Sequence, residues 1–157
     1  MTLRGLDQNF ECAEKHLEFA IENSHEILEK LDYLNDDVKH QFIKQISTVN
    51  NALRDVYSEI LMIKYKIRHD DESEVIKYIK EKIPILRKKL RISRKVYQQL
   101  KEYFIDKLSD KNNLLYVSAM IGEIADGRGN IYAVERHLTE VYLDLLKRVK
   151  IKKVVEQ

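Results

Sequence analysis

The chain has 157 residues, of which 44% are hydrophobic and 34% charged, with four glycines and one proline. This length fits a single domain, residues 1–157, with a hydrophobic core. So few turn residues exclude a many-stranded sheet, and no apolar run is long enough to span a membrane. The single cysteine, Cys12, cannot form an internal disulfide, and the N-terminus lacks a secretion signal, so we expect a cytoplasmic protein.

Two rows of apolar residues, spaced alternately three and four positions apart, predict the first two helices. The first row predicts a helix over about residues 7–34, and the second a helix over about residues 37–68. Asn35, Asp36 and Asp37 separate the two rows. Because these side chains bond their own backbone, we expect a loop there.

A third row, from Ile76 to Phe104, predicts a helix that begins at Asp71–Glu74, where the Asp71 carboxylate is expected to accept from the Glu74 amide. The row does not slip across Pro84, so we expect one kinked helix. A separate helix that starts at Pro84 is the alternative.

Two serines interrupt the apolar rows, Ser24 in the first and Ser93 in the third. Serine at such positions marks a close approach of helices or fixes their register, at some cost in stability. We therefore expect alanine or valine at either position to stabilise the protein.

The fourth helix is expected to be interrupted near its middle. Its apolar row begins Leu114, Val117, Ile121, Ile124 and resumes at Ile131, shifted by one position. Gly127 and Gly129 lie in the interval, and glycine tolerates backbone conformations that bend a chain. We expect a flexible bend or short loop over residues 127–130.

These elements predict an all-α fold, with four long amphipathic helices in an antiparallel, up-down-up-down, left-handed bundle. The alternative is an open pair of hairpins that completes its core only by dimerising. Apolar residues outside the minimal core rows favour this alternative: Phe19, Ile21, Leu28, Leu61, Met62 and Tyr65.

Charge is distributed unevenly along the chain. Residues 1–62 contain 6 Lys and Arg against 12 Asp and Glu, whereas residues 63–157 contain 22 against 14. In a heptad that starts at Ile83, four cations of the third helix lie at position e, beside the core: Lys80, Arg87, Arg94 and Lys101. Arg91 lies one turn away, at position b. A second basic cluster ends the last helix: Lys147, Arg148, Lys150, Lys152 and Lys153.

Two interpretations of these cations remain open. In the first, those of the third helix pair with acidic residues of a neighbouring helix, with Glu11, Glu14, Glu18 and Glu22 of the first helix as candidates. In the second, they form a surface that binds phosphate groups. Cations at the end of the last helix also complement its dipole without any ligand.

No catalytic, metal or cofactor site is expected. Glu22 and His25 have the spacing of a carboxylate-bridged metal site, but the helical frame places both toward solvent and no second such pair exists. Residues 126–130 lack the ligand pattern of a calcium loop. Cys12 lies between two glutamates, which disfavours a reactive thiolate.

The sequence therefore predicts a non-enzymatic helical bundle that acts through protein–protein association, as a homo-oligomer or a small subunit of a larger assembly. The alternative is a helical subunit that binds the backbone of RNA or single-stranded DNA through the basic face of the third helix and the basic C-terminus. Neither function involves a membrane.

Overall fold

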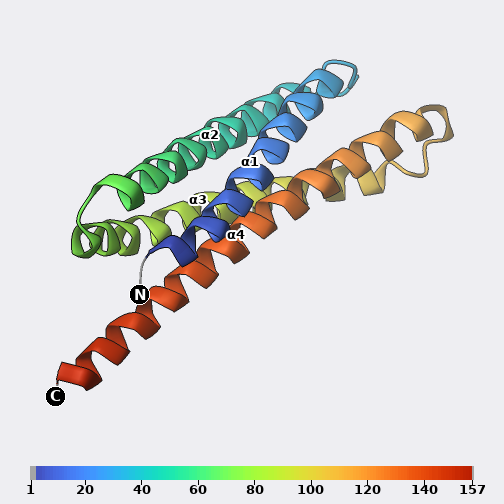
Figure 1. The fold of residues 1–157 in the computed structure, drawn as a ribbon. Coiled ribbons are helices and arrows are strands. Elements are labelled where there is room, and N and C mark those ends of the chain that lie inside the picture. Colours follow the sequence, from blue (N-terminus) through green and yellow to red (C-terminus); the bar gives the residue numbers. More distant parts are fainter. Residues whose placement is uncertain (1–2, 157) are drawn as a thin grey trace.

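The computed structural model describes residues 3–156, with the side chains of residue 3 and residues 5–148. Four α-helices and a short 3-10 helix follow one another: α1 (Arg4–Leu31), α2 (Lys39–His69), α3 (Glu72–Asp106), η1 (Lys111–Asn113) and α4 (Leu114–Glu156). The predicted all-α bundle of four helices is confirmed (Figure 1). Within the described residues, no helix is long and apolar enough to cross a membrane.

Each helix packs against two neighbours, so that the four helices form a ring around the core. α1 and α3 each contact both α2 and α4, whereas no contact joins α1 to α3 in the described residues. The contacts between α1 and α4 run in opposite sequence order, because Asn9 meets His137 and Lys30 meets Glu123. The left-handed crossing of the helices stays a prediction.

The interior is filled by the predicted rows. Phe10, Leu53, Leu90 and Ile131, one from each helix, are fully buried. A single chain therefore closes this core, without the second copy that the open-hairpin alternative requires.

The predicted interruption of the last helix is wrong. α4 is continuous through residues 127–130, because its core row contains Met120, which is fully buried, in place of Ile121. From Met120 the row passes through Ile124 and Gly127 to Ile131 at regular spacing, and no frame shift remains. Gly127 is buried and occupies a core position.

α3 begins at Glu72 and passes through Pro84 without a break, so a separate helix that starts at Pro84 is wrong. Asp71 precedes the helix as predicted, but its carboxylate forms no bond to a backbone amide. It accepts instead from the Ser73 hydroxyl at 2.5 Å.

Candidate phosphate or acidic-partner surface

Four of the five predicted cations of α3 lie on the side of that helix that faces α4, and Arg91 lies one turn away. We call all five the basic stripe: Lys80, Arg87, Arg91, Arg94 and Lys101. Arg94 fixes the side, because it contacts Glu135 of α4. Residues seven positions apart share one side of a helix, so Arg87 and Lys101 lie on the same side as Arg94. These cations are half-buried, and Arg91, one turn away, is exposed.

Arg94 neutralises a buried carboxylate. Its Nε lies 2.7 Å from one oxygen of Glu135, and a second guanidinium nitrogen donates to the other oxygen at 3.2 Å. Glu135 is only 9% exposed. The Arg94 guanidinium also lies over the ring of Tyr132, 5.3 Å from its centroid. Arg94 therefore has a structural role that its neighbours in the basic stripe do not share.

The other members of the basic stripe have no ion pair or side-chain hydrogen bond with any described residue: Lys80, Arg87, Arg91 and Lys101. Pairing with acidic residues of a neighbouring helix is therefore confirmed for Arg94 alone, whose partner belongs to α4. The candidate carboxylates of α1 are wrong, because α1 and α3 lie on opposite corners of the ring. The arrangement leaves these cations available to an external anion.

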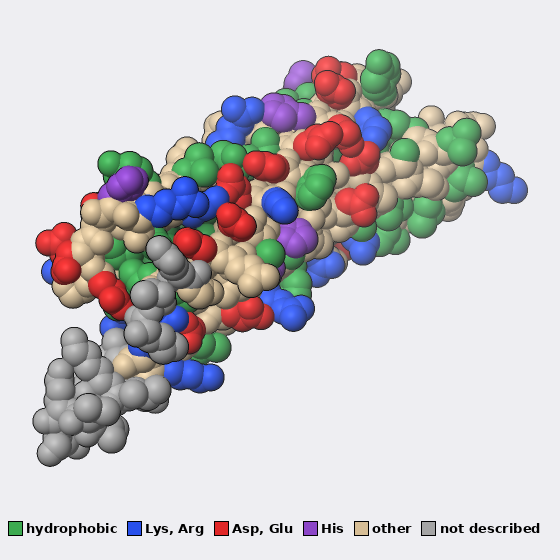
Figure 2. Space-filling model, viewed as in Figure 1, with side chains coloured by type: hydrophobic (Ala, Val, Ile, Leu, Met, Phe, Trp, Pro, Cys, Tyr) green, Lys and Arg blue, Asp and Glu red, His purple; other side chains and the backbone are tan. Residues whose placement is uncertain are grey.

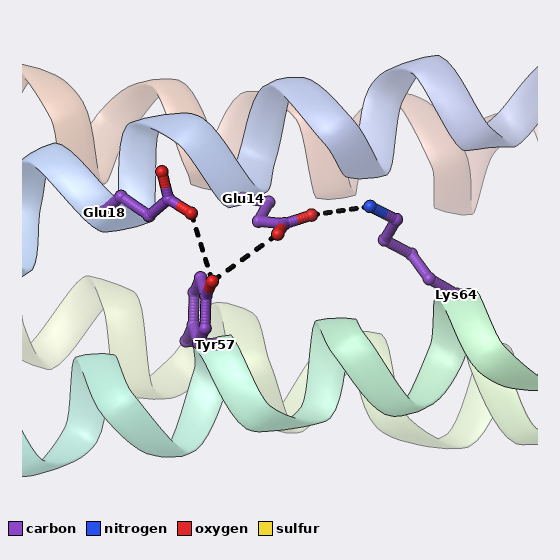
Figure 3. A network of polar contacts seen from close by, with 4 residues as sticks. All are labelled: Glu14, Glu18, Tyr57 and Lys64. Atoms are coloured by element: carbon purple, nitrogen blue, oxygen red, sulfur yellow. Dashed lines mark hydrogen bonds and ion pairs between the residues drawn. The ribbon is translucent and has the colours of Figure 1, made fainter.

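Two of the four candidate carboxylates of α1, Glu14 and Glu18, contact α2 instead. Glu14 pairs with Lys64 at 2.6 Å, and Glu18 accepts from the Tyr57 hydroxyl at 3.1 Å. Figure 3 shows Tyr57 pointing between Glu14 and Glu18, with Lys64 reaching Glu14 from the same helix as Tyr57. Burial and the two neighbouring carboxylates raise the pKa of Tyr57 above its ordinary value.

The facing side of α4 adds a cation and aromatic rings. At intervals of seven from Glu135, the same side of α4 presents Arg128 and Tyr142. Arg128 forms no ion pair with a described residue, and its Nε is buried without a hydrogen-bond partner among them. Tyr132, one turn from Arg128, is 53% exposed. Within these facing rows Glu135 is the one carboxylate, and Arg94 already binds it.

The basic cluster at the end of α4 is described only in part. Lys147 is exposed, and Arg148 pairs with Asp144 at 3.0 Å. The side chain of Lys150 lies outside the described residues, as do those of Lys152 and Lys153.

The residues considered for metal chemistry are dispersed. His25 contacts the Arg54 guanidinium at 2.7 Å, and Cys12 is a half-buried free thiol. Among the described side chains, no three His, Cys, Asp or Glu residues are placed to hold a metal ion together.

A polar network that reaches the core was not predicted. The Ser24 hydroxyl donates to the Ile21 carbonyl at 2.6 Å and accepts from the Asn50 amide at 2.7 Å. The Asn50 oxygen accepts from Arg54 at 2.8 Å. Asn50 is 7% exposed, yet it lies beside the apolar row of α2 and so carried no signal in the spacing of apolar residues.

Two hollows on the surface were also not predicted. A cavity of about 570 Å³ between α1 and α4 is lined by Phe19 and by carboxylates that include Glu22, Glu26 and Asp126. Figure 2 shows acidic side chains gathered along α1 on this face. A hydrogen bond with Glu123 and its negative charge raise the pKa of Glu26.

The second hollow is an apolar groove of about 330 Å³ between α2 and α3. Its apolar lining consists of Val49, Ala52, Ile92 and Val96, with Lys44 and Lys89 also lining it. Such hollows depend on the rotation of each helix about its own axis and on its shift along the bundle, and neither can be predicted from the spacing of apolar residues.

Comparison with models of known protein families, with curated protein sequences and with solved structures finds no match to this chain.

Proposed function

We propose that this protein is a non-enzymatic binding module that holds the phosphate backbone of RNA or single-stranded DNA along α3 and α4. One observation carries this proposal: Lys80, Arg87, Arg91 and Lys101 lack an anionic partner within the described chain. The 22 residues from Lys80 to Lys101 extend over about 30 Å at the rise of an α-helix, which is the length of several nucleotides.

The four cations without an internal partner concentrate positive charge along one helix. Like charges a turn or two apart on a helix repel one another, and the repulsion is relieved when an anion binds. Arg94 differs from the other four cations of the basic stripe, because it alone has a carboxylate partner and therefore a structural role. Arg128 extends the same positive surface onto α4.

Single strands are favoured as ligands because aromatic rings accompany the cations. Bases of a single strand stack on exposed aromatic side chains, and such stacking does not require a particular sequence. Tyr132 is 53% exposed beside the basic stripe, and Tyr142 lies further along α4.

The test is binding of fluorescent RNA and single-stranded DNA of about 20 nucleotides, measured by anisotropy over a range of salt. The variant carries Lys80→Gln, Arg87→Gln, Arg91→Gln and Lys101→Gln, and it keeps Arg94 so that Glu135 stays paired. We expect its affinity to fall by about tenfold or more, and the salt dependence to flatten by about 0.7 units per lost contact.

The matched control removes four cations from other surfaces: Lys15→Gln, Lys39→Gln, Arg68→Gln and Lys111→Gln. It has the same net charge as the test variant and should keep most of the affinity. An equal loss in both variants would show that binding is not located at the basic stripe. A parent protein that binds neither nucleic acid at micromolar concentration in physiological salt would refute the proposal.

Protein–protein association, the function expected first from the sequence, is the second candidate. The observation that favours it is the apolar groove between α2 and α3, because exposed apolar surface in a groove is typical of contact sites.

A further inference from the structure

The apolar groove between α2 and α3 suits an apolar group flanked by negative charge. Ile92 is 54% exposed and lies in the groove beside Val49, Ala52 and Val96. Lys44 of α2 and Lys89 of α3 also line it. Lys89 has only a loose pairing with Asp55, 3.5 Å long between two largely exposed side chains, so it remains able to meet another anion.

The opposite side of the bundle presents such a group. Phe19 of α1 is 57% exposed and lines the cavity between α1 and α4 together with Glu22 and Asp126. Beside it α4 presents Ala125 and Gly129, and a Cβ added to Gly129 would meet nothing within 4 Å. This side therefore offers an aromatic knob with carboxylates around it and room for an approaching helix.

The knob and the groove lie at the same height along the bundle. Asn50 of α2 bonds to Ser24 of α1. A Cβ added to Gly127 of α4 would meet both Tyr97 of α3 and Asn23, the residue before Ser24. These contacts place Ser24, Asn50, Tyr97 and Gly127 at the same position along the bundle axis. Phe19 lies about a turn and a half before Ser24 in α1, and Ile92 about a turn and a half before Tyr97 in α3. Because α1 and α3 are at opposite corners of the ring, the α1–α4 and α2–α3 sides face away from each other.

We propose that Phe19 of one copy docks in the α2–α3 groove of a second copy, with Glu22 of the first copy facing Lys44 and Lys89 of the second. Charge complementarity selects a second copy, since the chain itself carries both an acidic apolar knob and a basic apolar groove. The two contact surfaces differ and lie on opposite sides of the molecule. The association is therefore head to tail, and it adds copies in an open series.

This inference is independent of nucleic-acid binding, because the basic stripe faces α4 and the groove faces α2. The variant that lacks Lys80, Arg87, Arg91 and Lys101 should associate as the parent does. Failure of one proposal thus leaves the other standing.

The test uses two variants, Phe19→Ser and Ile92→Glu, in sedimentation velocity over a range of concentration. Both side chains are more than half exposed, so the changes should leave the fold intact, which circular dichroism checks. The parent should form a series of species beyond a dimer as concentration rises, and each variant alone should stay monomeric. A mixture of the two should form a heterodimer and stop there, because each partner keeps one working surface.

Tyr33→Ser is the matched control, since Tyr33 is an exposed aromatic residue just after α1 and outside both surfaces. It should associate like the parent. The proposal is wrong if the parent stays monomeric up to about 1 mM, if it stops at a dimer, or if the Phe19 and Ile92 variants fail to pair with each other. Continued self-association of either variant alone would also overturn it.

Discussion

Gly127 of α4 lies against the ring of Tyr97 of α3, and a Cβ added to Gly127 would come within 2.7 Å of the Tyr97 Cε2 atom. Tyr97 is fully buried, so its ring cannot move away into solvent. The missing side chain of Gly127 is therefore the space into which the Tyr97 ring fits. Glycine here serves close packing inside a continuous helix, and it does not bend the chain.

Gly127→Ala should destabilise the protein by about 1–3 kcal/mol, as an over-packed core residue does. In an unobstructed helix the same change stabilises by about 0.5–1 kcal/mol, because glycine loses more backbone freedom on folding than alanine. Urea unfolding gives the free energies of unfolding. A stabilising Gly127→Ala would show that the ring of Tyr97 is not held against Gly127.

Gly122→Ala and Gly129→Ala are the controls on the same helix, because nothing lies within 4 Å of a Cβ added at either position. Both should stabilise. In a Tyr97→Leu background the penalty of Gly127→Ala should shrink, since the obstructing ring is gone.

The sequence predicted the four helices well because their core rows are long and regular. The prediction failed in α4, where the apolar Ile121 was assigned to the core row and Gly127 was not. In the structure Gly127 is buried in the core, and Ile121 is only partly buried against the core. Apolar spacing does not detect a core position that is filled by a neighbour's ring. The frame shift inferred from Ile121 was therefore a misassignment of one residue.

The candidate site was predicted in part for a similar reason. Heptad spacing placed Arg87, Arg94 and Lys101 on one side of α3, but it did not state which helix lies on that side. In the ring of helices α3 is adjacent to α4, so the partner of Arg94 is Glu135 and not a carboxylate of α1. The groove at Ile92 depends on relative helix rotation, and spacing within one helix does not contain that information.

Ser24 and Ser93 should respond in opposite ways to alanine, although the sequence alone predicts stabilisation at both. The Ser24 hydroxyl accepts from Asn50, so Ser24→Ala leaves a buried amide without its acceptor and should cost about 1–2 kcal/mol. The Ser93 hydroxyl donates only to the Lys89 carbonyl of its own helix, so Ser93→Ala should be neutral or slightly stabilising. Thermal or urea unfolding measures both.

Asn50→Leu in the Ser24→Ala background checks the cause. Removing both partners of the bond should recover part of the stability lost with Ser24→Ala. If Ser24→Ala and Ser93→Ala have the same effect, the bond to Asn50 contributes nothing.

Asp36 links the α1–α2 loop to α3, and its carboxylate should make this contact sensitive to acid. The hydrogen bond from Tyr103 lowers the pKa of Asp36 below its ordinary value of 3.8, aided by the amide of Val38. A carboxyl with a lowered pKa in the folded state stabilises the fold above its unfolded pKa, and the contribution is lost as pH falls through the folded pKa. Tyr103→Phe should therefore lower stability at neutral pH and have progressively less effect below about pH 4.

The measurement is the free energy of unfolding of parent and Tyr103→Phe between neutral and acid pH. The phenylalanine ring keeps the edge contact with Phe42, whose centroid lies 4.9 Å from that of Tyr103, so the comparison isolates the hydroxyl. Tyr33→Phe, at a residue 81% exposed, controls for the loss of a phenol alone. A difference between parent and Tyr103→Phe that does not change with pH would contradict the assignment.

Arg94 and Arg87 lie one heptad apart in the basic stripe, and the structure predicts different consequences of losing each charge. Arg94→Gln leaves Glu135, which is 9% exposed, without its cation. The cost should be about 1–3 kcal/mol, below that of a fully buried pair because the Arg94 side chain remains partly exposed. Arg87→Gln should change stability by less than about 0.5 kcal/mol, because the half-buried Arg87 side chain has no charged partner to leave unpaired.

The double variant Arg94→Gln with Glu135→Gln identifies the cause. It removes the carboxylate together with its partner, so it should recover most of the stability that Arg94→Gln loses. Urea unfolding at neutral pH compares the four proteins. Equal effects of Arg94→Gln and Arg87→Gln would mean that the contact with Glu135 does not distinguish Arg94 from the rest of the basic stripe, and all five cations would then belong to the binding surface.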